Sequence, residues 1–423
     1  MDGAEVAEVS PFNLENRNSS MKAQKIIPWI NLVILIYLCL LVFYLPIAHT
    51  ETIRAFAFGI PSALWFFKMI LQKRLLFKRT PLDIPIMLCT AAAALSLTTA
   101  VDFRYSLEEF LGEWVLGISL FYLLVNNFQE ERLKYFFGAL LLGNLVMVVY
   151  GNYDFFRQGG SLVDYQVRAS ALHYIAGALA TYLVTVLPYI LLAAFFHPHM
   201  EARLLLFFLV LLNYFTLYLT HVRGAWIPAV LIGLFICGKF YSQKAVLILV
   251  AAGALFIFFI APEKILIHHA PWEAQESPAG KIDTGQARWE VWKFSLEKIR
   301  EHPFQMLGFG RRSFVKQYGE FYEKYKGALL WHAHNTFLNL SLQTGVQGLV
   351  FFLFLVYKLL RFTYQRAESE KEPLKKAFVF AAFFMVISFF LRNMADDFFA
   401  DDGALLFWML SGAAVSLQGD KNI

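Results

Sequence analysis

Charged side chains are scarce in this sequence. Asp, Glu, Lys and Arg together make up 16% of its 423 residues, whereas a soluble domain carries about a quarter. Hydrophobic residues make up 58%, and phenylalanine alone occurs 44 times. This composition argues against a soluble multidomain protein and predicts an integral membrane protein.

Cysteine is also scarce, and several common signatures are missing. Cys39, Cys89 and Cys237 lie inside apolar runs, without the spacing of metal ligands, so we interpret them as buried, inert thiols. We find no glycine-rich nucleotide loop, no internal repeat and no low-complexity tract. These absences argue against a nucleotide site and against a metal–thiolate site.

A cleavable secretion signal is not expected either. Residues 1–25 are polar and mildly acidic, and no small-residue cleavage site follows the first apolar run. Such a site is part of a secretion signal. We therefore expect the first apolar run to remain as a membrane anchor.

Long apolar runs dominate the rest of the chain. A membrane-spanning helix needs about 20 mostly apolar residues. Twelve candidates lie near 27–48, 53–71, 83–100, 110–126, 135–151, 170–196, 203–220, 223–238, 243–261, 335–357, 376–392 and 403–418. The predicted fold is an all-α integral membrane protein with about twelve transmembrane helices. Its expected divisions are a tail at 1–26, nine helices across 27–261, an extramembrane loop subdomain at 262–334, three helices across 335–418 and a tail at 419–423.

Lysine and arginine predict the orientation, because cytoplasmic loops carry an excess of these residues. With the N-terminus inside, the cytoplasmic loops hold the basic residues at 73–79, 132–134, 203, 239–244 and 358–376, and the opposite loops hold only scattered arginines. Both termini are therefore predicted to be cytoplasmic. Segment 262–334 is predicted to lie outside, in the periplasm of a Gram-negative cell.

Segment 262–334 is also predicted to contain short helices. Its prolines and glycine at 262, 271, 278 and 280 indicate an irregular start. A helix is predicted from about Thr284 to Arg300, with one apolar face that can lie on the membrane surface, formed by Trp289, Trp292, Leu296 and Ile299. A turn at 308–310 and a second short helix, from Phe314 to Tyr325, follow.

Arg288 and Arg223 are candidates for binding phosphate on this outer side. A guanidinium is planar, permanently charged and able to grip two oxygens at once. The alternative for Arg288 is a surface arginine that snorkels at the interface, and for Arg223 it is an anchor at the lipid headgroups. Gly224 follows Arg223 and leaves room for a bulky anion against the backbone.

A histidine motif follows the polar segment: His334-Asn335, nine residues, Gly345, two residues, Gly348. An ionisable side chain at a membrane boundary usually has a function. At the first turn of a helix the positive end of the dipole favours the neutral imidazole, which can accept a proton. Asn335 can cap the helix or bond a sugar, and the glycines permit close approach of another helix. The alternative is that His334 only caps the helix; His332 ranks lower because it does not begin the motif.

The chain resembles the O-antigen ligase family, within a superfamily that also contains polymerases. The resemblance rests on the His334 motif, on the length, span number and late outer loop, and on Arg223-Gly224-Ala225, Gln286-Ala287-Arg288-Trp289 and His302-Pro303 leading to Gly308-Phe309-Gly310. Family members use two arginines and the motif histidine as essential residues. The resemblance therefore implies catalytic roles for Arg223, Arg288 and His334.

The family also tends to hold an acidic residue in the last outer loop. This loop offers Asp396, Asp397, Asp401 and Asp402, and no histidine or other fixed ligand group accompanies them as in a metal site. The resemblance implies catalysis without metal or cofactor. The residues expected to bind substrate are Arg168, Arg311, Asn335, Asp396 and Asp397.

The implied reaction transfers a polysaccharide from undecaprenyl pyrophosphate to a hydroxyl of the lipid A–core oligosaccharide, with inversion at the anomeric carbon. Arg223 and Arg288 would neutralise the leaving pyrophosphate, and His334 would take the acceptor proton. The implied partners are the undecaprenyl-pyrophosphate-linked O-antigen, lipid A–core and membrane lipid, without nucleic acid. The implied location is the bacterial inner membrane, with the active site facing the periplasm.

Three other functions stay open. A polymerase of the same superfamily often carries two substantial periplasmic loops, whereas one is predicted here. A protein O-oligosaccharyltransferase usually extends past the last span with a soluble part. A lipid-linked oligosaccharide flippase would be expected to place charges midway through its spans. Here the mid-span positions are nearly free of charge, which favours an enzyme over a transporter.

Overall fold

The computed structural model describes residues 11–162, 166–173, 175–244, 275–277, 280–282, 284–325 and 330–417. Apart from one short hairpin, the regular elements in these ranges are helices, which confirms the all-α fold class. The longer helices are α1 (Pro11–Tyr44), α2 (Glu51–Gln72), α3 (Asp83–Ser96), α5 (Leu116–Asn127), α6 (Leu133–Arg157), α7 (Ala176–Phe196), α8 (Met200–Leu219), α9 (Arg223–Phe240), α11 (Thr284–Glu301), α14 (Thr336–Ser369), α15 (Pro373–Asn393) and α16 (Asp401–Ser416). The short elements are α4 (Phe103–Glu109), α12 (Ser313–Gln317), α13 (Gly319–Lys324), the 3₁₀ helices Leu97–Thr99 and Glu130–Arg132, the π-helical turn Phe110–Val115 and strands β1 (Gln275–Ser277) and β2 (Gly280–Ile282).

Eight helices in the described ranges are long and apolar enough to cross a membrane: α1 from Lys25, α2, α6 with its preceding turn, α7, α8, α9, α14 and α15. Helices satisfy their own backbone hydrogen bonds, which is why apolar runs of this length adopt them in lipid. Of the other four predicted spans, 83–100 and 403–418 form the shorter helices α3 and α16, and 110–126 consists of the π-helical turn followed by α5. The span predicted at 243–261 lies outside the described residues. A count of twelve is therefore not established.

Helix α7 lies at the centre of the bundle. It packs against α15, α8 and α9, and nearly all of its side chains from Leu179 to Ala194 are buried. Helix α16 packs on α5, and α14 packs on α3. The apolar core is continuous through these helices.

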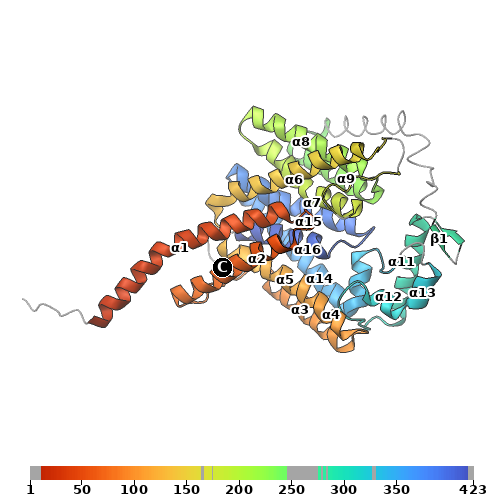
Figure 1. The fold of residues 1–423 in the computed structure, drawn as a ribbon, viewed down its shortest axis with the longest axis horizontal. Helices are drawn as coiled ribbons and strands as arrows, with labels where there is room; N and C mark the ends of the chain where they lie inside the picture. The colour runs from red at the N-terminus through yellow and green to blue at the C-terminus, as the bar shows by residue number, and fades with distance from the viewer. Residues whose placement is uncertain are drawn as a thin grey trace, which may run out of the picture.

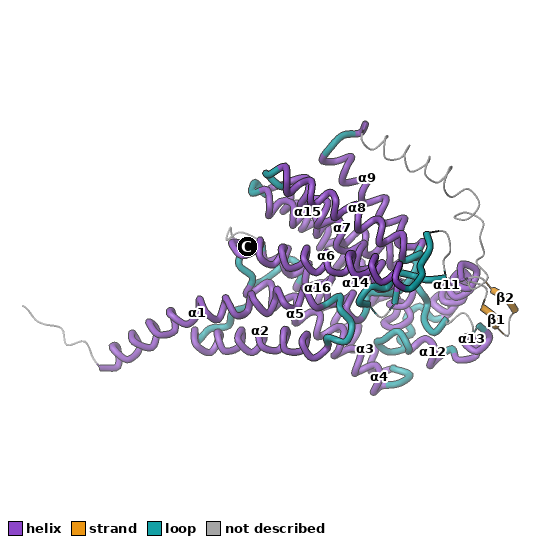
Figure 2. The backbone as a smooth tube through the Cα atoms, turned by 45° about the horizontal axis from the view of Figure 1, so that its top comes forward, coloured by secondary structure: helices purple, strands orange, loops and turns teal. Residues whose placement is uncertain are grey.

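Backbone hydrogen bonds gather the predicted outer loops at one end of this bundle. The Ala48 amide donates to the Leu172 carbonyl at 2.8 Å, and the Val101 amide donates to the Leu307 carbonyl at 3.0 Å. Helices α11 to α13 and the hairpin lie at this end, away from the C-terminus (Figures 1 and 2).

The predicted cytoplasmic loops gather at the other end. Lys375 pairs with Glu130 at 2.5 Å, and Lys239 pairs with Glu368 at 2.6 Å. The two sets of loops are therefore segregated as the alternation of spans requires. Which end faces the cytoplasm stays a prediction.

Helix α14 is broken at Gly345, which has φ +74° and ψ 171°. This conformation is essentially restricted to glycine. The break exposes the carbonyls of Leu342 and Gln343, which accept hydrogen bonds from the Leu307 amide at 3.0 Å and the Gly308 amide at 3.3 Å. The expected role of Gly345 in close helix packing is thus replaced by a helix break. A methyl group added at Gly348 would lie 2.0 Å from Thr344 Oγ1 and 3.6 Å from the Ala92 Cβ in α3.

The extramembrane helices have a small core of their own. Val291 of α11 is fully buried and packs with Leu307, Phe314 and Leu342, among others. The predicted helix from Thr284 is confirmed, but its expected apolar face is divided. Trp289 and Leu296 are 63% and 45% exposed, whereas Trp292 and Ile299 pack against the small core. The second predicted helix is present as α12 and α13, with a break at Tyr318.

Candidate functional site

The start of α14 holds the histidine motif in place. The Asn335 side chain caps the helix by accepting from the amides of Phe337 at 2.9 Å and Leu338 at 3.1 Å. Its amide nitrogen donates to the Met394 carbonyl at 2.9 Å. Asn335 therefore anchors α14 to the loop between α15 and α16, and the predicted cap is confirmed.

His334 lies immediately before this cap in a left-handed conformation, with φ +46°. A non-glycine residue adopts this region only when its surroundings hold it there. Two contacts do so: the His334 amide donates to Nδ1 of His332 at 2.9 Å, and Trp292 Nε1 donates to the His334 carbonyl at 3.3 Å. Both α11 and the 331–333 loop therefore position the histidine.

The imidazole of His334 faces Asp396, with 3.1 Å between Nδ1 and Oδ1. A carboxylate only accepts hydrogen bonds, so Nδ1 carries the proton in this contact. In the neutral imidazole the other ring nitrogen, Nε2, then carries the lone pair. The side chains of His334 and Asp396 are 16% and 15% exposed, so the pair is largely screened from water.

Asp396 is surrounded by cations. Its Oδ2 lies 3.3 Å from Arg392 Nη2 and 3.6 Å from Arg288 Nη2. Burial opposes ionisation of this carboxyl, but the His334 hydrogen bond and the two guanidinium groups together hold its pKa well below the ordinary value. Asp396 is therefore an anion that orients His334, Arg288 and Arg392 at the same time.

Arg392, one of the scattered arginines on the predicted outer side, is buried in the last turn of α15. It is 1% exposed, and its guanidinium carbon lies 4.9 Å from the Phe398 ring centroid. A signal for it existed: a basic residue at the end of an apolar helix, four positions before an aspartate, can form an i,i+4 pair. The same signal selects Asp396 from the four aspartates.

Asp397 has a different environment from its neighbour. Its Oδ1 accepts from Thr336 Oγ1 at 2.6 Å and its Oδ2 accepts from Asn339 Nδ2 at 2.5 Å. The residue is 5% exposed. Its carboxylate ties the first turn of α14 to the 394–400 loop, beside the position of Asp396.

His332, His334 and Asp396 bring three potential metal-ligand atoms within 4.8 Å of one another. Two features oppose a divalent cation there. His332 Nδ1 already accepts the His334 amide, and both oxygens of Asp396 already face cationic or donor groups, including two arginines. Burial lowers the pKa of His332 well below its ordinary value, so it is a neutral support for His334.

Arg223 begins α9 and is exposed. The next residue, Gly224, faces the loop that follows α15. A methyl group at Gly224 would lie 3.3 Å from the Ala395 Cβ and 3.9 Å from Arg392 Nη1. The space expected for an anion beside Gly224 is therefore bordered by this loop. Arg168 is also exposed, and the neighbouring Ala169 amide donates to the Leu219 carbonyl at the end of α8. Both arginines thus lie at the bundle end that carries His334.

Arg311 lines a cavity of about 540 Å³ that adjoins the loop. It donates to the Asp397 carbonyl at 3.2 Å and to Asp401 at 2.5 Å, and its guanidinium lies 5.5 Å from the Trp331 ring centroid. Arg54 pairs with Asp402 across the same cavity. Because its arginines are matched by carboxylates, this cavity suits a neutral polar ligand better than an anion.

Comparison with known proteins agrees with the motif. A sequence model of the family described as O-Antigen ligase matches residues 205–353. A putative polysaccharide ligase of Rickettsia bellii (strain RML369-C) is 36% identical over 75 residues, and one of Rickettsia felis (strain ATCC VR-1525 / URRWXCal2) is 35% identical over 75 residues. Each match covers 17% of this chain and 18% of the relative.

The chain therefore spans less than a fifth of the length of these relatives in the matched stretch. The family match contains Arg223, Arg288 and His334 and stops before Arg392 and Asp396. This multi-pass membrane protein is therefore similar to the O-antigen ligase family over residues 205–353.

Proposed function

We propose that this chain is a membrane glycosyltransferase that moves a polysaccharide from undecaprenyl pyrophosphate to a hydroxyl of a lipid A–core oligosaccharide. The observation that carries the proposal is the His334–Asp396 pair with Arg288 beside it. These groups come from three separate segments of the chain. They combine a proton acceptor with a cation in a site that is largely screened from water.

His334 acts as the general base. Its Nε2 removes the proton from the acceptor hydroxyl while the hydroxyl oxygen attacks the anomeric carbon. Asp396, at 3.1 Å, stabilises the imidazolium that forms. A positioned base of this kind contributes about 10²- to 10⁴-fold to a rate.

Arg288 and Arg223 stabilise the leaving group. The bond between the anomeric carbon and the pyrophosphate oxygen breaks, and its electron pair stays on that oxygen. The Arg288 side chain contacts Asp396 and is still 35% exposed. Part of its guanidinium can therefore face the phosphates. Fixed cations in a partly dehydrated site stabilise developing negative charge more strongly than in water.

The cavity lined by Arg311 receives sugar. Its matched ion pairs and Trp331 offer donors, acceptors and an aromatic surface without net attraction for phosphate. Arg168 and Asn335 are proposed to lie along the substrate path at the same end of the bundle. Asp397 lies beside the reacting groups and holds the 394–400 loop against the first turn of α14.

Transfer by the purified protein tests the proposal. His334→Ala should lose about 10²- to 10⁴-fold of the transfer of undecaprenyl-pyrophosphate-linked glycan to core lipid, measured by a lipopolysaccharide gel. His302→Ala is the matched control, because His302 is exposed at the end of α11. Full activity of His334→Ala would remove the base from the mechanism.

Two further observations separate this function from its alternatives. Activity should persist in a chelator, because the cations around Asp396 leave no favourable place for a divalent ion. In cells that lack the chain, a ligase leaves lipid-linked polymer and no ladder. A single repeat unit on the core would identify a polymerase instead.

A further inference from the structure

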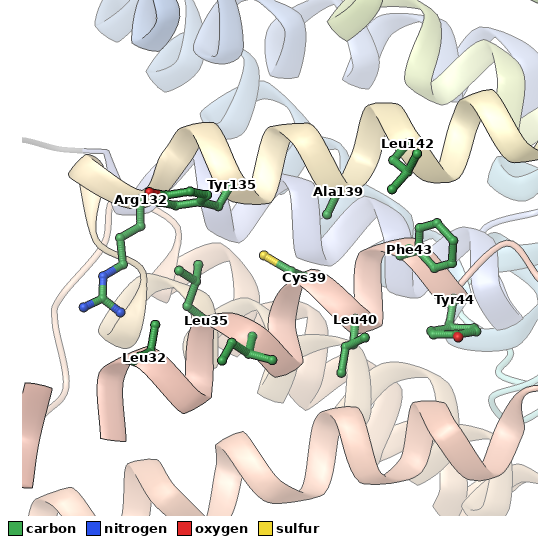
Figure 3. A pocket seen from close by; sticks show the side chains of 11 residues that line it. Leu32, Leu35, Cys39, Leu40, Phe43, Tyr44, Arg132, Tyr135, Ala139 and Leu142 are labelled. Carbon is green, nitrogen blue, oxygen red and sulfur yellow. The ribbon is translucent and has the colours of Figure 1, made fainter. Parts of the chain in front are cut away.

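A groove of about 700 Å³ lies between α1 and α6, far from the histidine site in the fold. Figure 3 shows its lining side chains, which are almost all apolar and come from both helices. Leu32, Leu35 and Cys39 lie along α1, and Ala139 and Leu142 lie along α6. The groove therefore presents a hydrophobic surface on the side of the bundle.

One cationic side chain, Arg132, lies at the end of this groove. Figure 3 shows the Arg132 guanidinium beyond Leu32. Its Nη1 is buried and has no hydrogen-bond partner within the part of the chain that the structure describes. The adjacent acid, Glu130, pairs with Lys375 at 2.5 Å. A buried guanidinium nitrogen without an acceptor is costly in an apolar setting, so this position favours an anionic partner.

The length of the groove matches that of one acyl chain. From Arg132 to Leu142 a helix rises about 15 Å at 1.5 Å per residue. This is half of the roughly 30 Å hydrocarbon core of a bilayer. An acyl chain of a single leaflet would therefore run along the groove while its phosphate lies beside Arg132.

The position also excludes a role in the proposed transfer. Arg132 precedes the start of α6, and the other end of that helix leads to the 158–173 loop, which bonds to the outer loops. The 25-residue α6 separates the two ends by about 37 Å. The predicted cytoplasmic loops at the Arg132 end are rich in lysine and arginine, and basic clusters at a membrane surface attract anionic lipids.

We propose that this groove is a specific site for an anionic phospholipid, with the phosphodiester on Arg132 and one acyl chain between α1 and α6. The phosphodiester supplies negative charge and acceptor oxygens to the part of the Arg132 guanidinium that lines the groove. It also fills the seam between two helices that pack against each other. The site is independent of the glycan transfer proposed above.

Binding of phosphatidylglycerol to the delipidated full chain tests the site by native mass spectrometry. Arg132→Gln should weaken binding of the first lipid about tenfold to a hundredfold, as expected for loss of a charged hydrogen bond. Lys134→Gln is the matched control, because Lys134 is exposed, two residues away and outside the groove lining. Ala139→Phe, which fills the groove without touching the cation, should also weaken binding.

The outcomes are distinguishable from failure of the transferase proposal, because no activity is measured. Phosphatidylcholine and diacylglycerol should bind more weakly than phosphatidylglycerol in the unaltered chain. Equal binding of phosphatidylglycerol to Arg132→Gln and Lys134→Gln would overturn the site. Tighter binding of undecaprenyl phosphate than phosphatidylglycerol, lost in Arg132→Gln, would show an isoprenoid occupant and overturn the assignment to phospholipid.

Discussion

Replacing Asp396 by asparagine removes one charge from the centre of three contacts. Its carboxylate faces His334 at 3.1 Å, Arg392 at 3.3 Å and Arg288 at 3.6 Å. Asparagine keeps the shape but cannot stabilise an imidazolium, and its amide can favour the wrong tautomer of His334. We therefore expect transfer to fall by about 10²- to 10⁴-fold.

The same substitution has a second cost, in stability. Arg392 is 1% exposed and would lose its counter-ion, which typically costs about 3–5 kcal/mol for a buried pair. Loss of activity in Asp396→Asn alone could then reflect unfolding. A second substitution, Arg392→Met, separates the two effects, because replacing a buried ion pair by neutral groups of similar volume is often neutral for stability.

The double variant Arg392→Met, Asp396→Asn should therefore regain thermal stability but not transfer. Thermal unfolding in detergent measures the first quantity, and the glycan-transfer assay measures the second. Recovery of transfer together with stability would refute the reasoning. Asp396 would then be only a counter-ion for Arg392, and His334 would need no carboxylate partner.

Three more predictions concern the two arginines, the break in α14 and the charge of Asp396. Arg288→Lys and Arg223→Lys should lose most transfer, because lysine keeps the charge but lacks the planar fork, and Ala at either position should lose essentially all of it; full activity of an alanine variant excludes that arginine. Gly345→Ala should destabilise the fold by about 1–3 kcal/mol, since φ +74° with ψ 171° suits only glycine, whereas Gly138→Ala, with open space around its Cβ, should be nearly neutral in thermal unfolding. The folded-state pKa of Asp396 lies below its unfolded value of about 3.9, so its stabilising contribution is present above about pH 4 and is lost as the pH falls through the folded-state pKa. The difference in unfolding free energy between the unaltered chain and Asp396→Asn should therefore shrink as the pH falls below about 4.

Much of the helical scaffold could be predicted from the sequence, because a membrane-spanning helix is a local property. An apolar run of sufficient length must satisfy its backbone within itself. The division between the predicted spans 203–220 and 223–238 is present, because α8 ends at Leu219 and α9 begins at Arg223. The helix beginning at Thr284 and the Asn335 cap were also predictable, because each depends on residues within a few positions.

The tertiary structure decided which distant residues meet. His334 and Asp396 are 62 positions apart. The spacing from Arg392 singles out Asp396 locally, but it does not show that this carboxylate meets His334 while that of Asp397 bonds to Thr336 and Asn339. The break at Gly345 likewise depends on amides more than thirty positions earlier, at Leu307 and Gly308. Local composition therefore determines which segments are helices, whereas the packing of the loops at one end of the bundle determines which charges pair, because ion pairs depend on distance in space and not along the chain.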